Sequence, residues 1–442
     1  MQNRRILRLK MLTKVFQLSK YPASDSLTLR SNIRAHILDG SLFLFAMSFV
    51  SVNTILPVFI QQIGGGAIAI GSVPVIWTIG LNLPQAILIR FTHPVGQIQP
   101  AVLRYGLLHR SSFLVIGVVT FAVVGRIPST VSVPLILTLI FLAAVTGSLG
   151  VPPWFHLFSK TTPVDLRGKL LAFRQLCGSS LGILGGFIVT AILSILSFPL
   201  NFASLFGLAF LLSMCSFYYL GVLAEPESET VKQIPERSAS IVSRAKAIFG
   251  RDKIFRNFLL ADAFTLMSMT ASSFYAVYAI QEFDLIPSFA GTFTVIVMAS
   301  MVAGNIVFGF LSDAFGHKLN LMLLAGASAA ASLVAATAGN VLVYGLAFFF
   351  MAWTLSLQGI SRLSFVAELC SETDRPVYIA LLNSLTAPTV AVGIFFGWVA
   401  REHGFLLMFT LSFTFGLFAV LWLYFGVTDP RTLRRKSEKA AS

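Results

Sequence analysis

Twelve long apolar runs dominate the chain, and each is long enough to cross a membrane as a helix, which takes about 20 residues. Only 11% of the 442 residues are charged, whereas soluble domains have about 25%, so the solvent implied is lipid. The sequence predicts an all-α integral membrane protein with twelve transmembrane helices near residues 37–60, 67–90, 105–125, 131–156, 170–194, 200–223, 255–281, 287–311, 319–338, 341–366, 377–400 and 404–426.

One polar stretch divides these runs into two sets of six, and the other connections are short. The predicted organisation has five parts. They are a basic cytoplasmic N-terminal tail (1–36), an N-terminal six-helix bundle (37–224), a cytoplasmic linker (225–254), a C-terminal six-helix bundle (255–426) and a cytoplasmic C-terminal tail (427–442).

The positive charges agree with a chain that crosses the membrane in alternating directions from one predicted helix to the next. All but two of the 32 Lys and Arg residues, the exceptions being Arg126 and Arg401, fall on the side that holds both chain ends. Basic residues near span ends stay cytoplasmic, so we expect both termini inside, in a bacterial inner membrane. The net charge of +14 then reflects topology, and no nucleic-acid partner is expected. The basic N-terminal tail could be an interfacial helix, a solvated tail or a targeting segment.

Two sequence echoes indicate an internal repeat. The stretches Val58–Gln62 (VFIQQ) and Tyr278–Glu282 (YAIQE) close the first and seventh runs, 220 positions apart. Likewise, Thr161–Gln175 and Ser371–Ser384 follow the fourth and tenth runs with arginines in matching places. Halves duplicated in this way pack around a substrate path near the middle of the bilayer.

The stretch GFLSDAFGHK, between the eighth and ninth runs, resembles the loop signature of the major facilitator superfamily. With the six-plus-six layout, this resemblance implies two pseudo-symmetric six-helix bundles of a transporter. The first half keeps a glycine at the matching place but loses the charges. In the family the aspartate contacts a neighbouring helix end, which suggests a latch between access states; an ordinary polar loop is the alternative. The signature residues are Gly309, Asp313, Gly316, His317 and Lys318.

Charged residues inside membrane spans are costly and point to function. Asp262, in the seventh run, and Asp39, in the first, are our candidates for proton coupling or gating. The alternative is a structural ion pair near the same helix end, of Asp262 with Arg256 and of Asp39 with Arg34. Uncharged polar residues lie deeper, where they turn toward a packing partner or a water-filled cavity. The predicted substrate-path residues among them are Asn53, Asn82, Gln85, Tyr275, Tyr278 and Asn383.

Three glycines of the fifth run, Gly178, Gly182 and Gly186, recur every four residues. They resemble the glycine-rich motif of drug–proton antiporters but lack its proline. Close packing against a neighbouring helix is therefore the favoured interpretation.

The sequence has no phosphate-binding loop, no clustered metal ligands and no catalytic triad, so neither an enzyme nor a cofactor or metal site is predicted. We expect a monomeric secondary active transporter or facilitator that moves a small apolar or weakly polar solute by alternating access; its partners are the solute, the bilayer and, if transport is coupled, protons. A transporter-like sensor or scaffold without flux is the alternative. An intramembrane enzyme would need Asp39 and Asp262 side by side.

Overall fold

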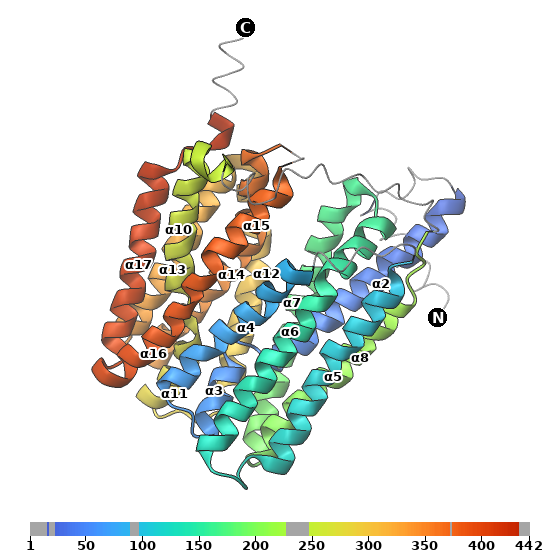
Figure 1. Ribbon diagram of the computed structural model, residues 1–442. Coiled ribbons are helices and arrows are strands. Elements are labelled where there is room, and N and C mark those ends of the chain that lie inside the picture. Colours follow the sequence, from blue (N-terminus) through green and yellow to red (C-terminus); the bar gives the residue numbers. More distant parts are fainter. Residues whose placement is uncertain (1–15, 17–22, 89–96, 227–246, 372–373, 433–442) are drawn as a thin grey trace.

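The computed structural model of the chain describes residues 16, 23–88, 97–226, 247–371 and 374–432, without the side chains of 23–26, 83–88 and 376. The described part of the N-terminal half is helical (Figure 1). Its helices are α2 (Ala23–Ser48), α3 (Ile55–Gln62), α4 (Ala67–Leu88), α5 (Gln99–Val123), α6 (Ser129–Thr161), α7 (Val164–Ile195) and α8 (Leu200–Gly221).

The described part of the C-terminal half repeats this pattern. Its helices are α10 (Lys253–Met269), α11 (Ser272–Glu282), α12 (Phe289–Phe315), α13 (His317–Thr337), α14 (Val341–Leu369), α15 (Arg375–Thr386), the 3₁₀ helix η2 (Ala387–Ala391), α16 (Val392–His403) and α17 (Phe405–Gly426). Most of the predicted linker, 227–246, and both terminal tails fall outside the described residues.

Ten stretches of the described helices are long and apolar enough to cross a membrane. They are α5 to α8, α10 with α11, α12 to α14, Val377–His403 and Phe405–Thr432. In the first predicted span the chain is interrupted between α2 and α3. In the second, α4 contributes the apolar stretch Ala67–Asn82, and the side chains beyond it lie outside the described residues. The all-α membrane class is confirmed, and the described residues account for ten of the twelve predicted spans.

Three predicted spans are broken near their middles, and local sequence explains two of the breaks. Between α2 and α3 the chain carries Ser51, Asn53 and Thr54, residue types of low helix propensity. Pro57 follows, and it has no N–H to donate to the carbonyl one turn earlier. In the eleventh span, Pro388 has the same effect within η2.

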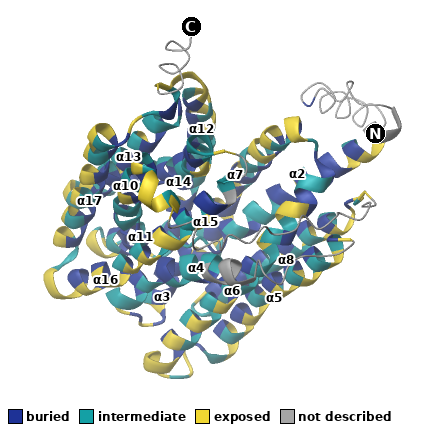
Figure 2. Ribbon diagram, turned by 45° about the horizontal axis from the view of Figure 1, so that its top comes forward, coloured by how far each residue is buried: buried dark blue, intermediate teal, exposed yellow. Residues whose placement is uncertain are grey.

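The outer faces of the helices are apolar. On α5 the exposed side chains include Leu107, Leu114, Val118 and Phe121, whose spacing places them on one side of the helix. Figure 2 shows exposed residues along the outer surface of the molecule and buried residues facing its interior. Apolar residues on both faces are typical of helices with lipid on one side and protein on the other.

The buried cores show how the halves meet. One large apolar cluster contains residues of both halves, such as Phe59 and Phe274. A second cluster, around Phe258 and Phe365, belongs to the C-terminal half alone. Two small ones, around Leu170 and Leu157, belong to the N-terminal half alone. The halves therefore share a core toward one end and have separate cores toward the other, where their ribbons diverge in Figure 1.

Candidate functional site: a cavity between the two halves

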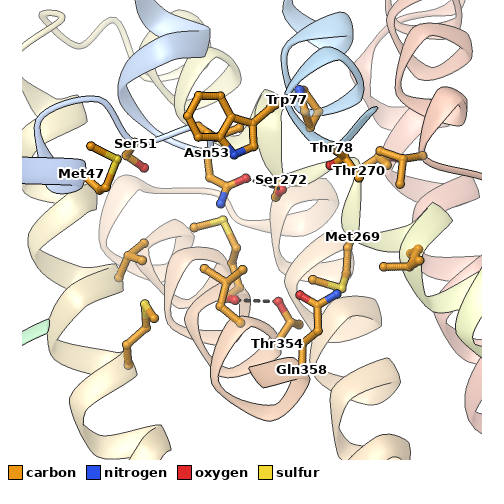
Figure 3. Close-up of a pocket in the computed structure, with 18 of the residues that line it drawn as sticks. Met47, Ser51, Asn53, Trp77, Thr78, Met269, Thr270, Ser272, Thr354 and Gln358 are labelled. Atoms are coloured by element: carbon orange, nitrogen blue, oxygen red, sulfur yellow. Dashed lines mark hydrogen bonds between the residues drawn. The ribbon is translucent and has the colours of Figure 1, made fainter. Parts of the chain in front are cut away.

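A cavity of about 560 Å³ lies between the halves. Helices α2, α4 and α7 form one wall; α10, α12, α14 and α15 form the other, and the breaks after α2 and α10 also contribute. Figure 3 shows side chains from both halves converging on this space. We call it the central cavity.

Most of the central cavity's lining is apolar and contains many methionines. Unbranched thioether side chains adapt to ligands of different shapes. Trp77 from α4 adds a large flat surface (Figure 3). The lining methionines are Met47, Met269, Met298, Met301 and Met351.

Carboxamides and hydroxyls supply most of the polar groups of this lining. Asn82 Nδ2 donates to the Thr78 carbonyl at 2.8 Å, and Asn53 Oδ1 accepts from Ser272 Oγ at 3.1 Å. Each amide keeps further donor or acceptor capacity for a ligand. Gln175 and Gln358 also line the cavity, one from each half.

Among the described residues that line the central cavity, one is charged, and it is Arg362 of α14. Its Nε lies 2.9 Å from Asp262 Oδ1 and its Nη2 lies 2.8 Å from Oδ2, which makes a bidentate ion pair. The same guanidinium donates to Asn383 Oδ1 at 3.0 Å and to Thr386 Oγ1 at 2.9 Å. Asp262 is buried behind the arginine. Such paired, forked geometry is the strong form of a charged hydrogen bond.

Asp39 lies in a second buried cluster, inside the N-terminal half. It accepts from Arg174 Nη2 at 3.0 Å and from Ser216 Oγ at 2.7 Å, and Arg110 Nη2 lies 3.6 Å away. Asp39 does not line the central cavity. Asp39 and Asp262 thus belong to separate clusters in different halves, so the paired carboxylates that an intramembrane enzyme would need are not formed.

Sequence reasoning missed the arginine partners of both aspartates. Arg110, Arg174 and Arg362 lie within predicted spans, but the charge count assigned them to the cytoplasmic loops. An arginine inside an apolar run was the signal that could have identified them. The expected alternative partner of Asp262 was wrong, because Arg256 donates to the carbonyls of Phe249 and Gly250 instead.

The predicted path residues separate into two groups. Asn53, Asn82 and Asn383 line the central cavity. Tyr275 and Tyr278 do not: Tyr275 is buried, with its hydroxyl 2.9 Å from Ser332 Oγ, and Tyr278 packs against aromatic rings of the C-terminal half. The side chain of Gln85 lies outside the described residues.

At one end of the central cavity the halves close on each other. Thr54 Oγ1 lies 2.7 Å from Thr294 Oγ1, which joins the first span to α12. The glycines of α7 pack tightly, as expected: a Cβ at Gly182 would lie 2.7 Å from Met298 Sδ, and one at Gly186 would lie 2.6 Å from Val295 Cγ2. At Gly186 the backbones of α7 and α12 approach so closely that only a small residue fits.

The loop signature lies at the opposite end of the C-terminal half. Gly316 ends α12 and begins α13 with φ +87°, a conformation that favours glycine. Asp313 is exposed, and its carboxylate forms no ion pair among the described residues. Instead, Arg431 pairs with Glu368 at 3.1 Å and donates to the Asp313 carbonyl at 3.3 Å. The expected contact of the Asp313 carboxylate with a neighbouring helix end is therefore absent from the described structure.

The remaining signature residues hold nearby helices. His317 Nδ1 lies 3.2 Å from Ser361 Oγ of α14, and Lys318 Nζ donates to the Tyr424 carbonyl of α17 at 3.3 Å. The signature thus joins α13 to α14 and α17 at this end of the half.

Glu225 joins helix ends in the N-terminal half. It accepts from the backbone N–H groups of Ile98 and Gln99, at 3.0 and 2.9 Å, and from Lys160 Nζ at 2.7 Å. Burial alone would raise the pKa of Glu225, but these hydrogen bonds outweigh it and hold the pKa below the usual range. The first-half counterpart of the loop signature, 89–96, lies outside the described residues.

The fold is shared with solved transporters. The chain superposes on the nucleoside transporter NupG with a TM-score of 0.68 at 13% identity, over 89% of this chain and 98% of the other. A D-xylose–proton symporter gives 0.68 at 15% identity, over 90% and 98%. The inward-open xylose transporter XylE from E. coli gives 0.67 at 14%, over 91% and 97%.

No curated protein is significantly similar in sequence to this chain. The family model of the Major Facilitator Superfamily, however, matches residues 38–282 and again 258–442. Each match begins close to the start of one predicted six-helix bundle, as expected of a duplicated unit. Fold and sequence therefore agree that the chain belongs to the Major Facilitator Superfamily.

Proposed function

We propose that this protein is a twelve-helix secondary transporter that moves a small solute through the central cavity by alternating access. The observation that carries the proposal is the cavity itself, which lies between the halves and is lined by polar residues at the breaks after α2 and α10. Solute sites of transporters lie at such repeat interfaces, where discontinuous helices expose polar groups.

The proposed orientation places both termini in the cytoplasm, following the distribution of basic residues. The sealed end at Thr54 and Thr294 then faces outward, and the diverging ends of the halves face the cytoplasm. In this proposed orientation the conformation faces the cytoplasm, and transport requires the sealed end to open.

The chemistry of the lining supports an apolar or weakly polar, uncharged solute. Thioethers, Trp77 and carboxamides offer apolar contact with a few hydrogen bonds, as in most small-molecule sites. The one charged lining side chain that the structure describes, Arg362, is neutralised by Asp262. The structurally similar proteins include a nucleoside transporter and a xylose symporter. Nucleosides and pentoses are therefore the first solutes to test, together with lipophilic compounds.

The Asp262–Arg362 pair is the proposed coupling group. A proton on Asp262 would remove the charge that Arg362 binds, so the arginine could change partners within the cavity wall. Asp39 is the reserve candidate, although its cluster lies away from the cavity. Movement of a proton would then be linked to rearrangement of α10 against α14.

Solute flux in sealed vesicles tests the proposal. Purified protein would be assayed with pentoses, nucleosides, amino acids and lipophilic compounds, with and without an inward pH gradient. The variant is Asp262→Asn, and Glu402→Gln, an exposed acid paired with Arg401, is the matched control. Gradient-driven flux that only Asp262→Asn loses supports coupling. Flux indifferent to the gradient makes the protein a facilitator, and absence of flux for every solute in folded protein favours the sensor.

A further inference from the structure

A second cavity, of about 240 Å³, lies inside the N-terminal half. Helices α2, α5, α6, α7 and α8 line it, and it shares no lining residue with the central cavity. Tyr105 and Gly150 at its wall are half-buried and Val151 is 43% exposed, so the cavity can be reached from outside the half. The proposed solute path does not run through it, and of its lining residues only Asp39 enters the proposed function, as the reserve coupling candidate.

Among the described residues, the charges that line this inner cavity do not balance. Its lining contains two guanidinium groups, Arg110 and Arg174, against one carboxylate, Asp39. In the C-terminal half, by contrast, Arg362 and Asp262 pair one to one. His109 does not restore balance, because its Nδ1 faces the Ala143 carbonyl at 2.9 Å and so donates, which a neutral ring can do.

One donor of the surplus cation is also unused. Arg174 is only 9% exposed, and its Nη1 is buried without a hydrogen-bond partner in the described structure. The guanidinium stacks over Trp154, 4.7 Å from the ring centre, which stabilises a cation but accepts no N–H bond. Burial of an unpaired donor and an uncompensated charge is costly, so native proteins provide partners.

We propose that the inner cavity binds a singly charged oxyanion, held by Arg174 and Arg110. A phosphodiester or carboxylate group fits this requirement, because its single negative charge equals the surplus and its oxygens accept from guanidinium groups. Two sources carry that chemistry: the headgroup of an anionic membrane lipid and a free anion from solution. The inference does not depend on which solute the central cavity takes.

Two variants test the site in different ways. Arg174→Gln removes the unused donor and the surplus charge. Gly150→Leu leaves every charge in place but fills space, since a Cβ at Gly150 would meet its nearest atom, in Tyr105, at 3.8 Å. The matched control is Arg401→Gln, which removes an exposed arginine at the other end of the molecule.

The measurement is thermal unfolding of the full-length protein at constant ionic strength. One arm adds inorganic phosphate or acetate to protein in neutral detergent. The other compares nanodiscs of phosphatidylglycerol with nanodiscs of phosphatidylcholine, and native mass spectrometry counts the bound lipids. The expected result is anion-dependent stabilisation in the wild type and in Arg401→Gln, weakened about tenfold or more in the apparent dissociation constant by either cavity variant.

Stabilisation by phosphate or acetate in detergent identifies a free anion, and stabilisation by phosphatidylglycerol alone identifies a headgroup. If Arg174→Gln fails to fold, Gly150→Leu decides. Wild-type stability indifferent to every anion and to lipid charge overturns the proposal. Stabilisation that persists unchanged in Gly150→Leu also overturns it, because the anion then binds elsewhere.

Discussion

Arg362 Nη2 of α14 lies 2.8 Å from Asp262 Oδ2 of α10, at the wall of the central cavity. The pair joins the seventh and tenth spans where both face the proposed solute path. Its partners Asn383 and Thr386 extend the network to α15. A rearrangement of this pair therefore changes the contacts among α10, α14 and α15 at the cavity wall.

Removal of one member of the pair should destabilise the protein. Arg362→Gln leaves Asp262 buried without its cation, and breaking a buried pair in this way costs about 3–5 kcal/mol. The double variant Asp262→Asn/Arg362→Gln should recover most of that loss, because no charge remains buried. Unfolding free energies in detergent would measure the cycle, and additive losses would contradict a coupled pair.

Gly186 should be intolerant of even one methyl group. A Cβ there would lie 2.6 Å from Val295 Cγ2 and 2.8 Å from its backbone nitrogen, so Gly186→Ala should separate α7 from α12. Overpacking of this kind costs about 1–3 kcal/mol. Gly207→Ala in α8 is the matched control, because no atom lies within 4 Å of its Cβ; there alanine should stabilise the helix slightly. Equal melting temperatures for the two variants would refute the close-packing interpretation.

Fold class was predictable from the sequence because long apolar runs and scarce charges leave few alternatives to membrane helices. Asn53, Asn82 and Asn383 line the central cavity, in keeping with the rule that polar groups in lipid turn inward. Tyr275 and Tyr278 follow the same rule, yet they are satisfied by partners inside the C-terminal half. The length of an apolar run does not reveal whether a polar side chain within it faces a cavity or a partner in the protein core.

The buried arginines show a second limit of sequence reasoning. When Lys and Arg residues are counted on each side of the membrane, an arginine near the end of a span is counted as a loop residue. A guanidinium group can, however, be buried within the span when it is paired with a carboxylate. The pairing of Arg362 with Asp262 joins residues 100 positions apart, which periodicity within one helix cannot reveal.

The turn at Gly316 should require glycine. At φ +87° an alanine is strained, and its Cβ would lie 3.2 Å from Arg431 Cδ. Gly316→Ala should lower the unfolding free energy by about 1–3 kcal/mol. Gly309→Ala, in the same signature but with open space around its Cβ, should not. Thermal unfolding of the two variants would compare them, and an unchanged Gly316→Ala would count against a strained turn.

Glu225 should stabilise the N-terminal half in a pH-dependent manner. Its pKa is lowered in the folded protein by Lys160 and by the N–H groups that open α5. The stabilisation is therefore fully present above the unfolded pKa of about 4.3 and is lost as the pH falls through the lower folded value. Glu225→Gln should be less stable than wild type at pH 7, and the difference should shrink below about pH 4. A difference that stays constant between pH 7 and pH 3 would contradict this role.

Access to Asn53 from both faces of the membrane tests alternating access most directly, because this residue lies in the central cavity beside the sealed end. Asn53→Cys would be placed in a chain whose Cys177, Cys215 and Cys370 are replaced by serine. Sealed vesicles of either orientation would be treated with a membrane-impermeant maleimide. Lys253→Cys and Ser129→Cys would serve as markers for the two faces. Alternating access predicts labelling of Asn53→Cys from both faces, while each marker reacts from one. Labelling of Asn53→Cys from the Lys253 face alone, however long the exposure, would contradict it.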